Sequence, residues 1–158
     1  MKRLAFFALF GIAAALPALG DDVPFAEPSP PMPGAATAYP ASLSDIMTGA
    51  QLRHIKLWEA IKAKNWDLAN FEMKQIQANL AKAAMLYSNI PMEFVDSAMK
   101  PLIGLQQAVA SKDETRAARS FADLTDACNM CHEAAGIGFV VIHTPTASPF
   151  SNQKFAPN

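Results

Sequence analysis

The chain has 158 residues, of which 51% are hydrophobic and 17% are charged, and its formal net charge is −1. This length suits one globular domain of about 100 to 150 residues with an ordinary hydrophobic core. A nearly neutral chain without a basic run gives no indication of nucleic-acid binding, so we expect no nucleic-acid partner.

Residues 1–20 have the composition of an export signal. Lys2 and Arg3 precede the apolar run LAFFALFGIAAAL at 4–16, and small residues follow it before Asp21. This run has 13 residues, fewer than the ~20 that a membrane-spanning helix needs. We therefore predict a signal peptide that is removed, a periplasmic location and a mature protein without a membrane span. Without the two signal cations, 11 basic and 14 acidic residues remain, a formal charge of −3.

Two segments lack the period of a helix. Residues 21–42 hold six of the twelve prolines, which predicts an extended, proline-rich linker. Residues 136–158 also lose helical spacing and contain further prolines, so we expect an extended tail that packs near the end of the last helix. Within this tail, FVVI either pairs as a short strand or covers the helices.

Between these segments, residues 43–135 contain four stretches whose apolar residues recur at steps of three and four, the spacing of an amphipathic helix. The stretches are residues 43–61, 66–87, 91–109 and 111–135. Connections of only a few residues favour antiparallel neighbours. The sequence therefore predicts an all-α fold, an antiparallel four-helix bundle.

Capping residues mark the ends of the predicted helices. Ser42 is followed three residues later by Asp45, and Ser111 by Glu114, which is the spacing of a capping box. We therefore expect Ser42 and Ser111 to open the first and fourth helices. Gly136 is expected to end the fourth, since glycine readily takes the backbone conformation that follows a helix.

The fourth stretch carries the most specific motif of the chain. Its only two cysteines, Cys128 and Cys131, are followed directly by His132 within ACNMCHEAAG. On a helix this spacing puts the three side chains on adjoining parts of one face. Two thioethers there can hold a porphyrin edge while the imidazole reaches the iron, and C-x-x-C-H is the pattern of c-type haem attachment. We therefore predict one covalent haem c.

Three other uses of the motif are open from the sequence. A thiol–disulfide oxidoreductase expects a strand–helix–strand context, which the predicted elements lack. A structural zinc site needs four ligands, and the chain has no second cysteine pair. A disulfide within one continuous helix is hindered, because the helix holds the two Cβ atoms too far apart.

A four-helix chain with C-x-x-C-H in its last helix resembles the class II c-type cytochromes, which include the cytochrome c-prime group and its low-spin relatives. The segment LSDIMTGAQLRHIKLWEA at 43–60 also resembles the first helix of the soluble periplasmic b-type four-helix cytochrome, in which a methionine at the matching place binds iron. The resemblance covers about residues 43–135 and implies that His132 is the proximal iron ligand. The long tail after His132 departs from that family, where the motif lies close to the C-terminus.

The second axial ligand is predicted from position along the bundle. Met47 lies four residues into the first helix, which is level with the end of an antiparallel fourth helix. His54 lies seven residues further, about 10.5 Å deeper, and is an alternative, as is His143 in the tail. Six side chains could in principle serve as this ligand: Met47, His54, Met73, Met85, Met99 and His143. Met73 and Met99 are expected in the core, and Met85 in the lining of the pocket.

A tail that folds back is expected to shield the macrocycle with Phe139 and Phe150, and His143 is expected to be part of this cover. Lower access of water would raise the reduction potential.

These features predict a single-electron carrier with its iron held by His132 and Met47, because a saturated iron has no free position for a substrate. The alternative is a five-coordinate haem protein that binds nitric oxide or carbon monoxide, as the resemblance to cytochrome c-prime implies. Enzymatic activity is not expected. Redox proteins are the expected partners, and dimerisation is common in the resembling family, so a homodimer stays open.

Overall fold

The computed structural model describes residues 41–87, 90 and 92–157. The predicted signal peptide at 1–20 and nearly all of the predicted linker at 21–42 lie outside the described residues. Within this part of the chain, none of the helices is both long and apolar enough to cross a membrane.

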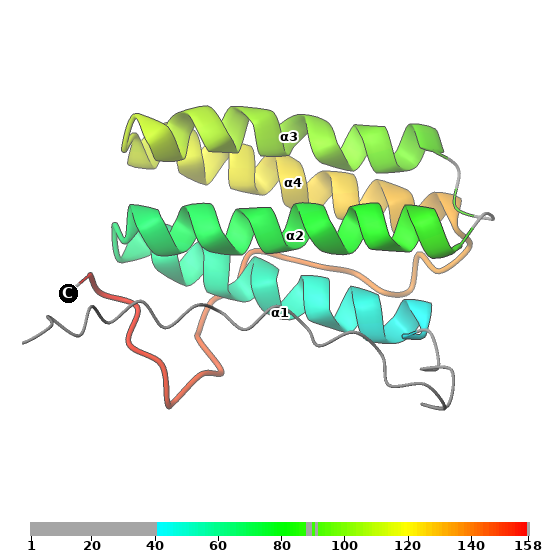
Figure 1. Cartoon of the computed structure of the whole chain (residues 1–158), viewed down its shortest axis with the longest axis horizontal. Helices are drawn as coiled ribbons and strands as arrows, with labels where there is room; N and C mark the ends of the chain where they lie inside the picture. The colour runs from blue at the N-terminus through cyan, green and yellow to red at the C-terminus, as the bar shows by residue number, and fades with distance from the viewer. Residues whose placement is uncertain (1–40, 88–89, 91, 158) are drawn as a thin grey trace, which may run out of the picture. The chain divides into compact units, whose positions relative to one another are not determined.

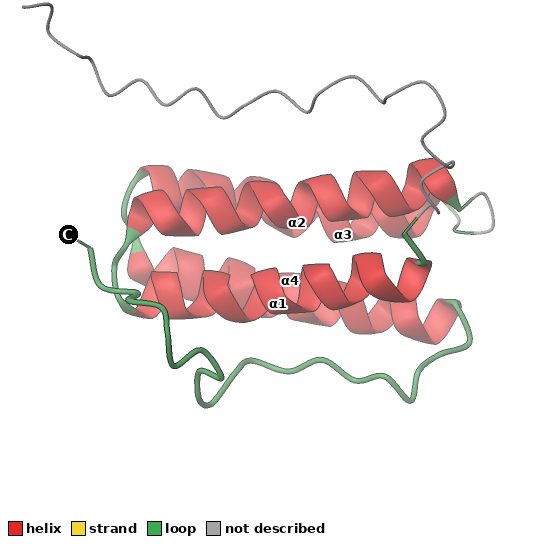
Figure 2. Ribbon diagram, turned by 60° about the horizontal axis from the view of Figure 1, so that its bottom comes forward, coloured by secondary structure: helices red, strands yellow, loops and turns green. Residues whose placement is uncertain are grey.

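Four helices make up the fold, as the sequence predicts, and neighbours in the chain run antiparallel (Figure 1). They are α1 (Leu43–Lys62), α2 (Trp66–Leu86), α3 (Met92–Ala110) and α4 (Glu114–Ala134). The helix α1 packs mainly against α2, and α3 mainly against α4, while α1 and α4 have the least direct contact. The described residues contain no strand, so FVVI does not pair (Figure 2). The all-α antiparallel bundle is confirmed.

Two of the three helix ends that the sequence marks, those at Ser42 and Gly136, are confirmed. Ser42 accepts the backbone N–H of Asp45, whose carboxylate accepts the backbone N–H of Ser42, which completes the predicted capping box. Asn65 caps α2 through the N–H of Leu68. Gly136, with φ of 73°, follows the end of α4.

The predicted opening of α4 at Ser111 is wrong. The N-cap is Asp113, which accepts the backbone N–H of Arg116. The hydroxyl of Ser111 is engaged with the preceding helix instead, since it donates to the carbonyl of Gln107, 2.9 Å away. Serine side chains often bond back to a carbonyl one turn earlier, and here this contact removes Ser111 from the start of α4.

Two short connections of the same design close the bundle at one end, which we call the connection end. After α1, Lys64 donates to the carbonyl of Ile61 and Asn65 to that of Ala60; after α3, Lys112 and Asp113 make the equivalent bonds. This pair of bonds is the Schellman motif. Both lysines take the left-handed conformation, with φ of 55° and 56°. In each connection the residue that completes the motif, Asn65 or Asp113, is also the N-cap of the next helix.

The hydrophobic core occupies the half of the bundle next to these connections. Its residues come from the second halves of α1 and α3 and the first halves of α2 and α4, with Phe121, Leu57, Met73 and Leu105 fully buried near the centre. Met99 packs against this core from α3. The predicted core positions of Met73 and Met99 are thus confirmed. The opposite half, which we call the pocket end, is built differently.

The residues after α4 form an extended strap, residues 137–157, that runs back along α1 and α4 from the pocket end to the connection end (Figures 1 and 2). Lys56 of α1 lies over the ring of Phe150, with its Nζ 4.7 Å from the ring centroid. Asn65 donates its side-chain N–H to the carbonyl of Phe155 over 3.0 Å. The strap therefore covers the side of the bundle where α1 and α4 have the least contact with each other.

Candidate cofactor site

A cavity of about 660 Å³ lies at the pocket end, between the start of α1 and the end of α4. All four helices and the strap contribute to its lining, which is mainly apolar; it includes Leu43, Ile76, Leu80, Ala83, Phe94, Val95 and Leu124. Sites for small molecules and cofactors typically have volumes of about 300 to 1,000 Å³ and an apolar lining with a few polar groups. This cavity meets both conditions.

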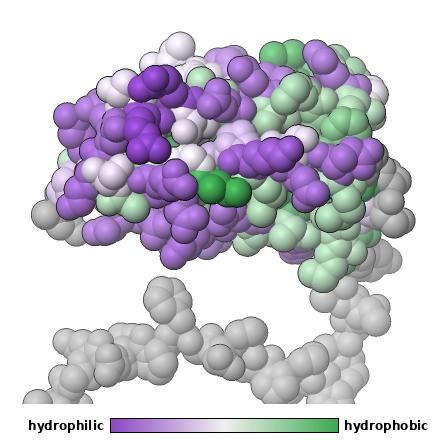
Figure 3. Space-filling view, turned by 90° about the horizontal axis from the view of Figure 1, so that it is seen from above, coloured by the Kyte–Doolittle hydropathy of each residue, from purple (hydrophilic) through white to green (hydrophobic). Residues whose placement is uncertain are grey.

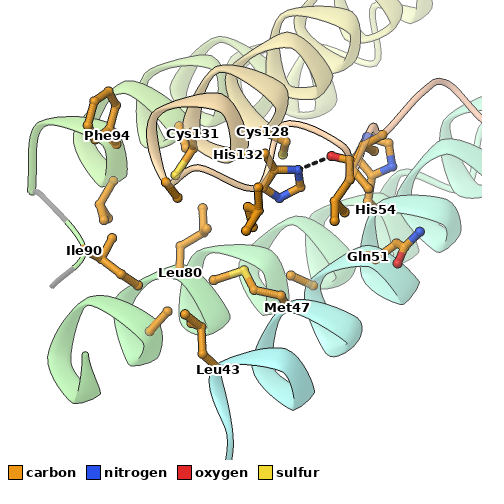
Figure 4. Close-up of a pocket in the computed structure, with 18 of the residues that line it drawn as sticks. Leu43, Met47, Gln51, His54, Leu80, Ile90, Phe94, Cys128, Cys131 and His132 are labelled. Carbon is orange, nitrogen blue, oxygen red and sulfur yellow. Dashed lines mark hydrogen bonds between the residues drawn. The ribbon is translucent and has the colours of Figure 1, made fainter. Parts of the chain in front are cut away.

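The motif of α4 forms one wall of this cavity. Cys128, Cys131 and His132 all line it, as the predicted helical spacing requires (Figure 4). Both cysteines are half-buried and neither forms a disulfide. The three side chains that the sequence singled out are therefore brought together on one cavity wall.

The imidazole of His132 has a defined partner on one of its two nitrogens. Nδ1 lies 2.6 Å from the backbone carbonyl oxygen of Val140 in the strap, the contact drawn as a dashed line in Figure 4. A carbonyl can only accept, so Nδ1 carries the proton and the lone pair is on Nε2. Imidazoles that bind metals are typically held in this way, with the second nitrogen donating to a carbonyl or carboxylate.

Met47 lies on the opposite wall. It lines the same cavity from α1, and in Figure 4 its thioether and the His132 ring extend into the cavity from facing helices. The sequence predicts that Met47 lies level with the end of α4, because α1 and α4 are expected to run antiparallel. The cavity thus presents an imidazole nitrogen and a thioether sulfur from two sides.

His54 lines the cavity two turns further along α1 and is only 4% exposed. Its Nε2 lies 2.9 Å from the hydroxyl oxygen of Thr125, which itself donates to the carbonyl of Phe121. Burial, assisted by the charge of His143, lowers the pKa of His54 to about 4. The ring is therefore neutral at pH 7, and its Nε2 is occupied by the hydrogen bond to Thr125.

Burial also acts on the two thiols. It raises the pKa of Cys128 to about 11, with a further contribution from Cys131, and it raises the pKa of Cys131. Both thiols are protonated at pH 7. Cysteines that attack disulfides have lowered pKa values, so this environment is unlike that of a thiol–disulfide oxidoreductase.

The remaining candidates lie elsewhere. His143 lies on a smaller cavity of about 290 Å³ between the strap and α1, and its Nδ1 donates to the carbonyl of Thr144 over 3.0 Å. Met85 is 79% exposed and does not line the larger cavity, which corrects its predicted place in the lining.

The predicted cover by Phe139 and Phe150 is also wrong. Phe139 is 83% exposed, and Phe150 packs on Lys56. Three aliphatic residues of the strap line the cavity instead: Ile137, Val140 and Ile142. The tail thus lines the cavity through aliphatic side chains and not through aromatic rings.

Two residues of the site were missed by the sequence reasoning. Thr125 holds His54, and Asn129, one of the two variable positions inside the motif, binds the strap. Thr125 is placed one turn before the motif on the same helix, a spacing that could have marked it. Asn129 gives no such signal, because its partner lies 13 residues later in a segment without period.

Hydrophobic side chains gather at the surface near one end of the face shown in Figure 3, on the side of the pocket end. Those exposed by 45% or more in this half include Met85, Leu86, Met92, Met130, Phe139 and Val141. The pocket end therefore carries exposed apolar surface.

Comparison with protein-family models, with curated proteins and with solved structures finds no match to this chain.

Proposed function

We propose that this protein is a periplasmic mono-haem c-type cytochrome that carries single electrons between redox partner proteins. The observation that carries the proposal is the cavity wall on which Cys128, Cys131 and His132 lie together, opposite Met47. The motif is that of covalent haem attachment, and the apolar cavity fits a porphyrin in size and in polarity.

Each residue has a role that its chemistry allows. Cys128 and Cys131 would form the thioether bonds, and His132 would bind the iron through Nε2. Met47 would bind on the other side with its sulfur. Bound haem supplies a one-electron iron couple, and a histidine–methionine pair raises its reduction potential. The residues of the chain hold the group, exclude water and leave no position for a substrate.

The competing uses of the motif have less support. The raised pKa of both cysteines disfavours a disulfide exchanger. In the part of the chain that the structure describes, no three His, Cys, Asp or Glu side chains form a group that could hold a metal ion, so structural zinc lacks a ligand set there.

The exposed apolar surface at the pocket end suits brief contact with a redox partner. Transient electron-transfer contacts are small, and the group that exchanges the electron must lie close to the partner. We therefore place the partner contact at the pocket end rather than at the connection end.

The experiment is expression of the full chain with haem-attachment machinery, followed by intact mass and by visible and magnetic spectra. We expect one haem per chain and a low-spin iron in both oxidation states. Replacing both cysteines with alanine should abolish the covalent adduct. A wild-type product at the bare polypeptide mass would refute the proposal.

Met47→Ala tests the second ligand. We expect a high-spin, five-coordinate iron that binds carbon monoxide rapidly when reduced, whereas Met85→Ala, an exposed methionine outside the cavity lining, should leave the spectra unchanged. A wild-type iron that is already five-coordinate would instead favour a protein that binds nitric oxide or carbon monoxide.

A further inference from the structure

Asn129 joins the haem motif to the strap by two hydrogen bonds. Its side-chain N–H donates to the carbonyl of Ile142, and its side-chain oxygen accepts the backbone N–H of Ile142, each over 2.8 Å. The amide of one side chain thus pairs with both backbone groups of one strap residue. This fixes the direction of the strap as well as its distance from α4.

The anchored residue lies two positions beyond the residue that contacts His132. Val140 accepts the Nδ1–H of His132, and both Val140 and Ile142 line the cofactor cavity. In an extended segment, residues two apart point to the same side. Holding Ile142 against α4 therefore also holds Val140 at the edge of the cavity.

Two backbone hydrogen bonds constrain the first residues of the strap. The backbone N–H of Ile137 donates to the carbonyl of His132, and that of Val140 donates to the carbonyl of Ile137. These bonds turn the chain out of α4, but they leave its direction beyond Val140 open. Asn129 supplies the contact that brings the next residues back onto the helix.

We propose that Asn129 is the positioning residue for His132: it clamps the strap so that the Val140 carbonyl fixes the orientation and tautomer of the axial imidazole. The role as an axial ligand rests on the proposed function; the clamp itself does not. The residue that positions His132 then lies within the C-x-x-C-H motif itself. Asn129, at one of the two variable positions, holds the strap whose Val140 carbonyl accepts the Nδ1–H of His132.

The clamp is tested first on the chain without haem. Asn129→Ala removes both bonds, and Asn129→Asp keeps the size of the side chain but sets a second acceptor against the Ile142 carbonyl. We expect hydrogen exchange of the Ile142 amide to be at least about tenfold faster in both variants, which corresponds to about 1.4 kcal/mol of local opening free energy, within the range for two lost neutral hydrogen bonds.

Met130→Ala is the matched control, because it changes the other variable position of the motif and its side chain is 55% exposed. It should leave Ile142 exchange at the wild-type rate. Circular dichroism shows whether each variant keeps its helices. If Asn129→Ala has lost helix, the Ile142 exchange rate of Asn129→Asp tests the clamp in its place. Unchanged exchange of Ile142 in folded variants would overturn the clamp.

The second readout is the ring Nδ1–H of His132 in the haem-loaded protein, measured by nuclear magnetic resonance. We expect its exchange with water to be about tenfold faster or more in Asn129→Ala than in the wild type and in Met130→Ala. If haem attaches normally and this proton is equally protected in all three proteins, Asn129 does not position His132, although the proposed function stands. A wild type that takes up no haem refutes the proposed function and the role of His132 as an iron ligand, while the clamp is still decided by the exchange of the Ile142 amide.

Discussion

His54 and Thr125 are joined by a buried hydrogen bond in which the imidazole is the donor. The Thr125 hydroxyl donates its proton to the carbonyl of Phe121, 2.9 Å away. It can therefore only accept a hydrogen bond from Nε2 of His54. The ring is packed on Phe121 as well, with the two ring centroids 4.3 Å apart. This arrangement fixes the tautomer of His54 and holds its ring in the wall of the cavity.

Thr125→Val should destabilise the folded chain by about 1–3 kcal/mol, because it keeps the shape of the side chain but leaves a buried imidazole N–H without a partner. Thr125→Ser keeps the hydroxyl and should cost no more than the loss of one methyl group, about 0.8 kcal/mol. Urea unfolding of the three haem-free proteins provides the comparison. Equal stability of the valine variant and the wild type would show that the bond contributes nothing.

Acid should destabilise the haem-free chain through His54. Its pKa in the folded state, about 4, lies below its usual value of 6.5, so the unfolded chain binds this proton more readily. The contribution is fully present above pH 6.5 and is lost as the pH falls towards 4, for a total of about 3 kcal/mol. His54→Gln should flatten the decline of unfolding free energy with falling pH in this window. A variant with the same slope as the wild type would contradict the assignment.

A partly buried ion pair between α1 and α2 should show energetic coupling between its two residues. Nη1 of Arg53 lies 3.2 Å from Oε2 of Glu72, whose side chain is only 2% exposed. Arg53→Met removes the cation beside a buried carboxylate and should cost about 1–2 kcal/mol, less than for a fully buried pair because the Arg53 side chain is 35% exposed to water. The double variant Arg53→Met with Glu72→Leu should recover much of that loss. A double-mutant cycle measured by urea unfolding checks this, and simple additivity of the two single changes would refute it.

Lys112→Gly should stabilise the bundle. Lys112 has a φ of 56°, which costs an L-residue about 1–2 kcal/mol and costs glycine almost nothing. Glycine adds entropy to the unfolded chain, so we expect a net gain of about 0.5 kcal/mol. Thermal unfolding measures the change. Lys64→Gly relieves the same strain but loses the ion pair with Glu114, 2.8 Å away at the surface, so it should gain less. A lower melting temperature for Lys112→Gly would contradict this account.

The helices could be predicted because their signals are local. The step of three and four in the apolar residues and the predicted helix ends at Ser42 and Gly136 each depend on neighbours in sequence, and each is found in the structure. The start of α4 was mistaken because Ser111 has two local partners to choose from. It bonds back to α3, and Asp113 takes the cap.

The parts of the site that lie on helices could be predicted, because the order of the helices fixes which residues are level with one another. Once the order of α1 and α4 is antiparallel, the level of Met47 opposite the motif follows, and the structure has both on one cavity. The strap was not predictable in this way. Its path depends on single long-range contacts, such as Asn129 with Ile142 and Lys56 with Phe150, which leave no period in the sequence.

The core and the cavity occupy opposite halves of the bundle, and this division bears on how the protein can change. Packing in the connection half decides whether the chain folds, while the lining of the pocket half decides what it holds. Substitutions at lining positions outside the core, such as Leu43 or Phe94, can therefore alter ligand fit without disturbing the residues around Phe121. Substitutions should therefore lower the free energy of unfolding less at the pocket end than at the connection end.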